Sequence, residues 1–303
     1  MTPSPATGPP SAGNSGTKPA LTRVAVYRRT VGASLDRVWE NVLDWEHLPW
    51  LHRSSFADLQ IQQAGAWGWR AQAVTTQGRE LRLELVVERA ALRYVSRTLE
   101  GEGAGTEIWT QLRVRSAHQT DVEVEFRLPD IPAAAAESVG AAYTRLYTQL
   151  WNEDEEMMRQ REVRLASRRA VAHAPREAVE LRLGDLESLR TRLPLQVEFS
   201  GEPFWLVELG GVLRAHSAVC PHKLGPLPAA GSAGSAGSAG SAGPTGSTGG
   251  DAGARVQCPW HGYRFDVRTR ASCGGRKWKG TLAVAPRVGV EAGEVVLRTP
   301  QPN

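Results

Sequence analysis

The sequence predicts an α+β domain, built from an antiparallel sheet and one long helix, followed by a second, mostly β domain. Three observations lead to this prediction. The chain has 303 residues, a length that accommodates two domains. Apolar and polar residues alternate in several segments between residues 57 and 130, which is typical of half-buried strands. A long helical pattern then runs from Ala133 to Arg169, before further strand patterns begin.

The first domain opens with a strand at Arg23–Val31 and a short helix for which Ser34 provides the N-cap. Further strand segments lie at residues 67–74, 81–87, 108–114 and 121–126. A strand, short helices, an antiparallel sheet and a closing helix together form a helix-grip arrangement, in which the last helix lies across the sheet above a cavity. In the second domain, residues 205–209 and 213–219 are expected to form a strand pair.

Three segments are expected to lie outside the folded domains. Residues 1–20 are rich in Pro, Gly and Ser and lack an apolar core segment, so we expect a disordered tail rather than a secretory signal. Residues 170–177 are expected to be a linker. Residues 229–253 contain four Gly-Ser-Ala triplets, which bury too little to offset their ordering entropy, so a disordered insert is expected. The predicted domains therefore span 21–169 and 178–303.

Composition narrows the classes of partner. The net charge is +4 and the basic residues are scattered through both halves, so no nucleic-acid partner is expected. The chain has no apolar run long enough to cross a membrane, so we expect a cytoplasmic protein without a membrane anchor.

Two short motifs in the second domain carry metal-binding chemistry. They are Cys220-Pro221-His222 and Cys258-Pro259-Trp260-His261-Gly262. Two thiolates and two imidazoles suit a [2Fe–2S] cluster in which the Cys pair holds one iron and the His pair holds the other. Zinc is the alternative, but zinc fingers usually pair Cys with Cys and His with His, whereas each motif here carries one of each. The pattern favours the cluster.

The segments CPHKLGPL and CPWHGYRFDVRTRASCGG, with these motifs at their starts, resemble the Rieske ferredoxin family. The resemblance covers residues 178–303 and implies that Cys220, His222, Cys258 and His261 bind a [2Fe–2S] cluster. Respiratory Rieske proteins carry an additional disulfide, for which these segments lack the cysteines. The remaining cysteine, Cys273, is expected to be a packed residue rather than a reactive thiol.

A second motif lies in the first domain. Residues 40–52, ENVLDWEHLPWLH, are similar to the signature of the catalytic subunits of Rieske oxygenases, whose catalytic domains belong to the START/polyketide-cyclase-like (SRPBCC) superfamily. The resemblance implies that His47 and His52 bind a mononuclear Fe(II). It also implies that Asp44 hydrogen-bonds a ligand histidine and receives the link from a Rieske histidine of a neighbouring unit.

Iron that activates O₂ commonly has two His ligands and one carboxylate, which in this family lies on the final long helix. Asp154 shares the apolar face of that helix, whereas Glu153 and Glu155 lie about 100° to either side and are expected to be dispensable. Asp154 is therefore the predicted third ligand. The alternative is a solvated face on which Asp154 neighbours Arg159 or Arg161. Three histidines without a partner pattern are expected to be bystanders, namely His118, His173 and His216.

These resemblances imply a Rieske non-haem iron mono- or dioxygenase that hydroxylates or demethylates a small apolar or aromatic molecule with O₂. An external reductase or ferredoxin would supply electrons, since the chain has no Gly-rich nucleotide fingerprint. The family habit is a homotrimer, but its Rieske domain usually comes first, whereas here it comes last. The alternative function is a ferredoxin-like electron-transfer or ligand-sensing protein, with a START-like hydrophobic cavity and no mononuclear iron.

Overall fold

The structure is a computed structural model that describes residues 20–172, 180–232, 252–275 and 278–300. The chain divides into two compact units, residues 1–159 and 160–303. Nearly all of the expected tail at 1–20 lies outside the described residues, as do most of the expected linker at 170–177 and most of the insert at 229–253.

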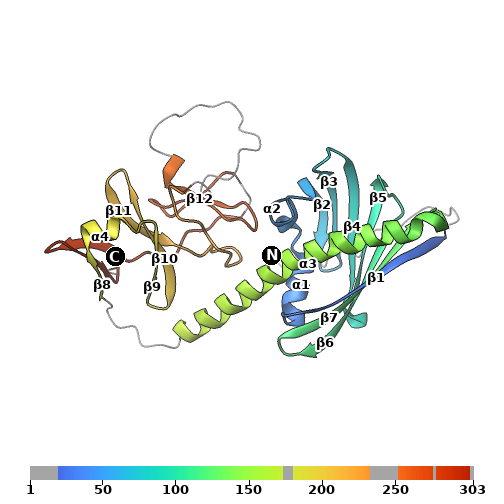
Figure 1. Ribbon diagram of the computed structural model, residues 1–303, viewed down its shortest axis with the longest axis horizontal. Helices are drawn as coiled ribbons and strands as arrows, with labels where there is room; N and C mark the ends of the chain where they lie inside the picture. The colour runs from blue at the N-terminus through green and yellow to red at the C-terminus, as the bar shows by residue number, and fades with distance from the viewer. Residues whose placement is uncertain (1–19, 173–179, 233–251, 276–277, 301–303) are drawn as a thin grey trace, which may run out of the picture. The chain divides into compact units, whose positions relative to one another are not determined.

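The described part of the first unit contains a seven-stranded antiparallel sheet (Figure 1). Its order is β1-β7-β6-β5-β4-β3-β2, so β2 to β7 form a meander and β1 closes one edge by pairing with β7. The strands are β1 (Leu21–Val31), β2 (Phe56–Gly65), β3 (Gly68–Thr75), β4 (Glu80–Glu88), β5 (Arg93–Gly101), β6 (Glu107–Ser116) and β7 (Gln119–Pro129). A 3₁₀ turn, η2 (Arg89–Ala91), links β4 to β5.

Three short helical segments connect β1 to β2. They are α1 (Leu35–Leu43), η1 (Trp45–His47) and α2 (Leu48–Leu51). The Ser34 side chain accepts a hydrogen bond from the Arg37 backbone N–H, which confirms the predicted N-cap. The short η1 and α2 turns bring two histidines, His47 and His52, to the end of α1.

The long helix α3 (Ala133–Ala172) lies across the sheet (Figure 1). Tyr143 and Tyr147 of α3 pack on Phe126 of β7, with ring centroids 5.2 and 4.8 Å away. Gly140 allows the close approach, because a Cβ at this position would lie 2.4 Å from the carbonyl oxygen of Val24. A large antiparallel sheet closed by a long helix is the helix-grip arrangement that the sequence predicts.

The described part of the second unit is mostly β, as predicted. It contains three three-stranded sheets, of order β11-β10-β9, β12-β13-β14 and β15-β16-β8. The elements are β8 (Glu180–Asp185), α4 (Leu186–Arg190), β9 (Leu195–Phe199), β10 (Glu202–Leu209), β11 (Val212–Ser217), η3 (Ala252–Ala254), β12 (Arg255–Gln257), β13 (Arg264–Asp266), β14 (Ser272–Cys273), β15 (Arg287–Glu291) and β16 (Glu294–Arg298). Among the described residues, no helix is both long and apolar enough to cross a membrane.

Candidate metal centres

The first Cys-His motif lies in a tight loop after β11. Cys220 is fully buried, and its backbone N–H donates to the carbonyl of Gly225 at 2.8 Å. Its own carbonyl accepts from the backbone N–H of Leu224 at 3.0 Å. Leu224 has a φ of 65°, a left-handed conformation that lets the chain reverse within a few residues. These bonds close the loop that carries Cys220 and His222.

The second motif lies in the turn between β12 and β13. The backbone N–H of Cys258 donates to Tyr263 at 2.9 Å, and the N–H of Gly262 donates to Cys258 at 2.9 Å. Gly262 has a φ of 66°, a conformation that suits glycine. Val256 and Phe265, which are directly opposite each other on the two strands, are fully buried. The hairpin thus holds Cys258 and His261 on a packed base.

The two loops bring the four predicted cluster ligands together. The imidazoles of His222 and His261 lie with ring centroids 4.8 Å apart at 86°, and the Nδ1 atoms of both are buried. A hydrogen bond from the Cys258 thiol lowers the pKa of Cys220, burial opposes this, and the backbone N–H groups of His222 and Lys223 lower it further. The donor set of two sulfurs and two imidazoles, with amides aimed at a sulfur, fits a [2Fe–2S] cluster.

Sequence reasoning missed two residues that shape this site. A Cβ on Gly225 would lie 2.7 Å from the Trp260 ring and 3.1 Å from the Cys258 sulfur, so only glycine fits between the loops. Trp278 lies beside His222, with ring centroids 5.1 Å apart. Cys273 is half-buried on β14, with no disulfide partner among the described residues. The Gly225 position is visible in the sequence only as a Gly in a ligand loop, and Trp278 carries no local signal.

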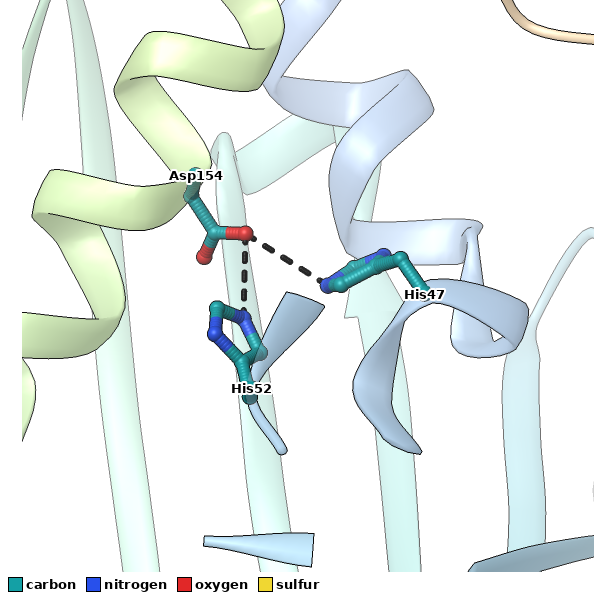
Figure 2. Close-up of side chains that lie close together, drawn as sticks. All are labelled: His47, His52 and Asp154. Atoms are coloured by element: carbon teal, nitrogen blue, oxygen red, sulfur yellow. Dashed lines mark ion pairs between the residues drawn. The ribbon is translucent and has the colours of Figure 1, made fainter. Parts of the chain in front are cut away.

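Three predicted iron ligands converge in the first unit (Figure 2). His47 and His52 come from the turns after α1, and Asp154 comes from α3. Asp154 Oδ1 lies 3.4 Å from His47 Nε2 and 3.1 Å from His52 Nε2. Both histidines are almost fully buried. The two imidazole rings stand edge to face at 78°, and the Nε2 atom of each ring faces the carboxylate.

These separations fit one metal ion. Two donors that each lie about 2.1 Å from an ion are about 3.0 Å apart at a right angle and about 3.4 Å apart at a tetrahedral angle. The donor set of two imidazoles and one carboxylate is that of a facial triad. Asn41 Nδ2 also donates to Asp154 Oδ1 at 2.9 Å, which orients the carboxylate. The site therefore offers the donor chemistry of a divalent transition-metal site, and its two carboxylate–imidazole separations are compatible with one ion.

Without a metal, the same groups form an ion pair. Burial lowers the pKa of His52, but the charge and hydrogen bonds of Asp154, together with Glu153, outweigh burial and raise it to about 9. Burial raises the pKa of Asp154, but His52, His47 and the hydrogen bond from Asn41 more than offset this, and the pKa is lowered. Both partners are therefore charged near neutral pH in the metal-free chain.

Glu153, which the sequence places off the apolar face and predicts to be dispensable, contacts one of the predicted ligands. Its carboxylate Oε2 lies 2.6 Å from His52 Nδ1. Glu155 has contacts of its own elsewhere, because its side chain accepts a hydrogen bond from the Gly32 N–H at 2.7 Å and pairs with Arg29. Both side chains are long enough to reach back from their backbone positions to groups on other elements.

The other sequence predictions have separate outcomes. Asp44 ends α1, where its backbone N–H bonds to Asn41, and its predicted role toward a ligand histidine stays a prediction. Arg159 pairs with Glu156 rather than with Asp154.

Among the described residues, the histidines that were expected to be bystanders lie outside both sites. His216 is buried, its Nδ1 faces the Ser217 carbonyl, and its Nε2 accepts a hydrogen bond from the backbone N–H of Ala230. His118 lies in the exposed turn between β6 and β7, and His173 lies outside the described residues.

Comparison with known proteins identifies one domain. Residues 180–285 match the Rieske [2Fe-2S] domain family. The second unit therefore contains a Rieske domain, which implies a [2Fe–2S] cluster and a redox or electron-transfer role. A search of the curated proteins gave no match.

Several solved structures are similar to the N-terminal part. An aromatase/cyclase from a Streptomyces species is 15% identical over 45% of this chain and 93% of its own, with a TM-score of 0.38. A START superfamily protein from Mycobacterium smegmatis is 16% identical over 44% of this chain and 97% of its own, with a TM-score of 0.36. A norcoclaurine synthase from Thalictrum is 14% identical over 48% of this chain and 99% of its own, with a TM-score of 0.40.

Proposed function

We propose that this chain, which carries a Rieske [2Fe-2S] domain over residues 180–285, is a non-haem iron oxygenase with its catalytic iron on His47, His52 and Asp154. The observation that carries the proposal is the convergence of these three donors, from segments about a hundred residues apart, in a chain that also has a redox domain. Their separations from one carboxylate oxygen, 3.4 and 3.1 Å, suit a single ion.

In this proposal the residues of the Rieske domain hold an electron-storing group. A Rieske cluster, when bound, accepts and releases one electron at a potential that its His ligands raise. Cys220 and Cys258 supply the thiolates, and the backbone N–H groups of His222 and Lys223 stabilise the charge on Cys220. His222 is only partly buried, so it offers a route for electrons from an external reductase or ferredoxin.

The residues of the first unit prepare the metal site. A facial triad on Fe(II), when bound, leaves open coordination positions for O₂. Asn41 holds the Asp154 carboxylate in place, and the Trp69 indole N–H donates to the Val42 carbonyl at 3.2 Å, which fixes the end of α1. Both contacts preorganise the ligands before metal arrives.

In this proposal the substrate is a small apolar or aromatic molecule. Burial raises the pKa of both Tyr94 and Tyr147. The negative charge of Asp154 makes a smaller contribution in the same direction. These tyrosines therefore keep their O–H groups and sit close enough to Asp154 to feel its charge. Trp39 stacks edge to face on Tyr94 at 6.4 Å. Trp39 and Tyr94 both belong to the buried core of the first unit, so the substrate class stays a prediction.

The alternative is a ferredoxin-like electron-transfer or ligand-sensing protein without mononuclear iron. One observation favours it: Asp154 and His52 satisfy each other as an ion pair, so the buried carboxylate does not require a metal. The two functions differ in metal content. Iron and acid-labile sulfide, measured per chain after anaerobic loading, should give about three irons and two sulfides for the oxygenase. About two irons with two sulfides would support the alternative and contradict our proposal.

A further inference from the structure

A carboxylate outside the triad contacts one of its histidines. The two ring nitrogens of His52 face different acidic groups. Nε2 lies 3.1 Å from Asp154 Oδ1, and Nδ1 lies 2.6 Å from Glu153 Oε2. The His52 side chain is only 2% exposed, so water cannot easily replace either contact. The ring is therefore held on both sides.

This arrangement selects one tautomer of His52. Glu153 accepts a hydrogen bond, so a neutral His52 must carry its proton on Nδ1. Its Nε2 then presents a lone pair toward Asp154, on the side where His47 Nε2 also lies. A carboxylate that accepts the outer N–H of a metal-binding histidine fixes the ring and makes the inner nitrogen more basic.

Glu153 is itself held by hydrogen bonds. Gln149, one turn earlier on α3, donates through Nε2 to Glu153 Oε1 at 3.1 Å and to Ser54 Oγ at 2.8 Å. Ser54 follows His52 by two residues. One oxygen of Glu153 thus contacts Gln149 while the other contacts His52, so the carboxylate has a defined orientation.

We propose that Glu153 is a positioning residue that holds His52 as the Nδ1–H tautomer and strengthens divalent-metal binding at His47, His52 and Asp154. The inference rests on the proposed function, since it needs a metal at that triad. It also replaces the sequence-based view of Glu153 as dispensable.

Cobalt(II) binding to the full chain with its Rieske cluster tests the proposal. Cobalt is measured by equilibrium dialysis and elemental analysis, so the iron of the cluster does not interfere. Glu153→Ala should raise the Kd for cobalt about 10- to 100-fold. Glu153→Gln should raise it less, because the amide oxygen still accepts the N–H of His52 but carries no charge. Glu156→Gln is the control, because Glu156 is exposed and pairs with Arg159 three residues later. The Kd of this variant for cobalt should stay within about twofold of the wild-type value.

Thermal unfolding separates positioning from a structural role. A positioning role predicts that Glu153→Gln keeps a wild-type Tm while its cobalt affinity falls. If Glu153→Gln had a lower Tm but an unchanged cobalt affinity in the folded protein, the proposal would be overturned. A wild-type Kd for cobalt in Glu153→Ala would also overturn it. If Glu153→Ala does not fold, a wild-type Kd in Glu153→Gln would have the same meaning. If Asp154→Ala bound cobalt as tightly as wild type, the triad itself would be wrong, and the proposed function would fail with it.

Discussion

A hydrogen bond of 2.9 Å joins the side chain of Asn41 to the carboxylate of Asp154. Asn41 lies on α1 and is buried, and Asp154 lies 113 residues later on α3. The bond links the segment that carries both histidines to the helix that carries the carboxylate. The relative positions of the three triad residues therefore depend on how α3 packs against α1.

Asn41→Ala should weaken the triad without abolishing it. The substitution removes a hydrogen bond to a charged acceptor, which is worth about 1.5–3 kcal/mol. Part of this loss should appear as lower stability and part as weaker cobalt binding, measured by thermal unfolding and equilibrium dialysis. Asn152→Ala is the matched control, because Asn152 accepts an exposed hydrogen bond from Arg29 and does not contact the triad. Equal cobalt affinity in the two variants would contradict the prediction.

Gly225→Ala should impair cluster loading. The added Cβ would lie 2.7 Å from the Trp260 ring and 3.1 Å from the Cys258 sulfur, so one of the two ligand loops must move. The visible chromophore per chain measures the loss, which we expect to exceed half. Gly253→Ala is the control, because a Cβ there meets no atom within 4 Å. A full chromophore in Gly225→Ala would show that the loops adjust freely.

The two cluster cysteines should be indispensable, and the third should not. Cys220→Ala or Cys258→Ala removes a thiolate from a fully buried site, where water cannot replace it. Each change should abolish the chromophore and the EPR signal of the reduced cluster. Cys273→Ala should keep both, because Cys273 lies on β14 outside the two loops. Survival of the signal without Cys220 would refute the ligand assignment.

His216 should make the stability of the chain fall in mild acid. Burial lowers the pKa of His216 to about 4, and the hydrogen bond to the Ser217 carbonyl offsets this only in part. The unfolded chain, with a His pKa near 6.5, then binds more protons than the folded chain between pH 6.5 and 4. The contribution of His216 to the free energy of unfolding is therefore fully present above about pH 6.5. It declines as the pH falls toward 4, by about 3 kcal/mol in total.

The pH effect is isolated by comparing His216→Gln with wild type. The variant lacks the titrating group, so its loss of stability between pH 7.5 and pH 4.5 should be smaller. Thermal unfolding at several pH values gives both profiles. Parallel profiles would show that His216 does not titrate differently in the folded and unfolded chains.

The fold and the inward position of Asp154 were predictable from local pattern, whereas His47 and His52 were predicted from the resemblance to the Rieske oxygenase signature. Alternation within strands predicted the antiparallel sheet, and the phase of the apolar residues on α3 predicted that Asp154, rather than its neighbours, faces inward. The phase argument missed Glu153 because it treats a side chain as a point on the helix surface. A glutamate has a flexible stem, and its carboxylate reaches His52 from a backbone position beside the apolar face.

Contacts between segments that are far apart in the sequence could not be predicted from the sequence. Trp278 lies beside His222, although 55 residues separate them and no local pattern joins them. The tight fit of Gly225 against Trp260 depends on how two loops meet. Such contacts are decided by tertiary packing, which composition and periodicity do not encode.

Asp154→Ala, compared with wild type for iron content and for the EPR signal of the reduced Rieske cluster, tests the central claim most directly. Asp154 Oδ1 lies within ion-pair distance of both His47 Nε2 and His52 Nε2. The variant should lower iron from about three to about two per chain and leave the Rieske signal unchanged. Equal iron content in the two proteins, with the Rieske signal intact, would contradict the assignment of a mononuclear iron to this triad.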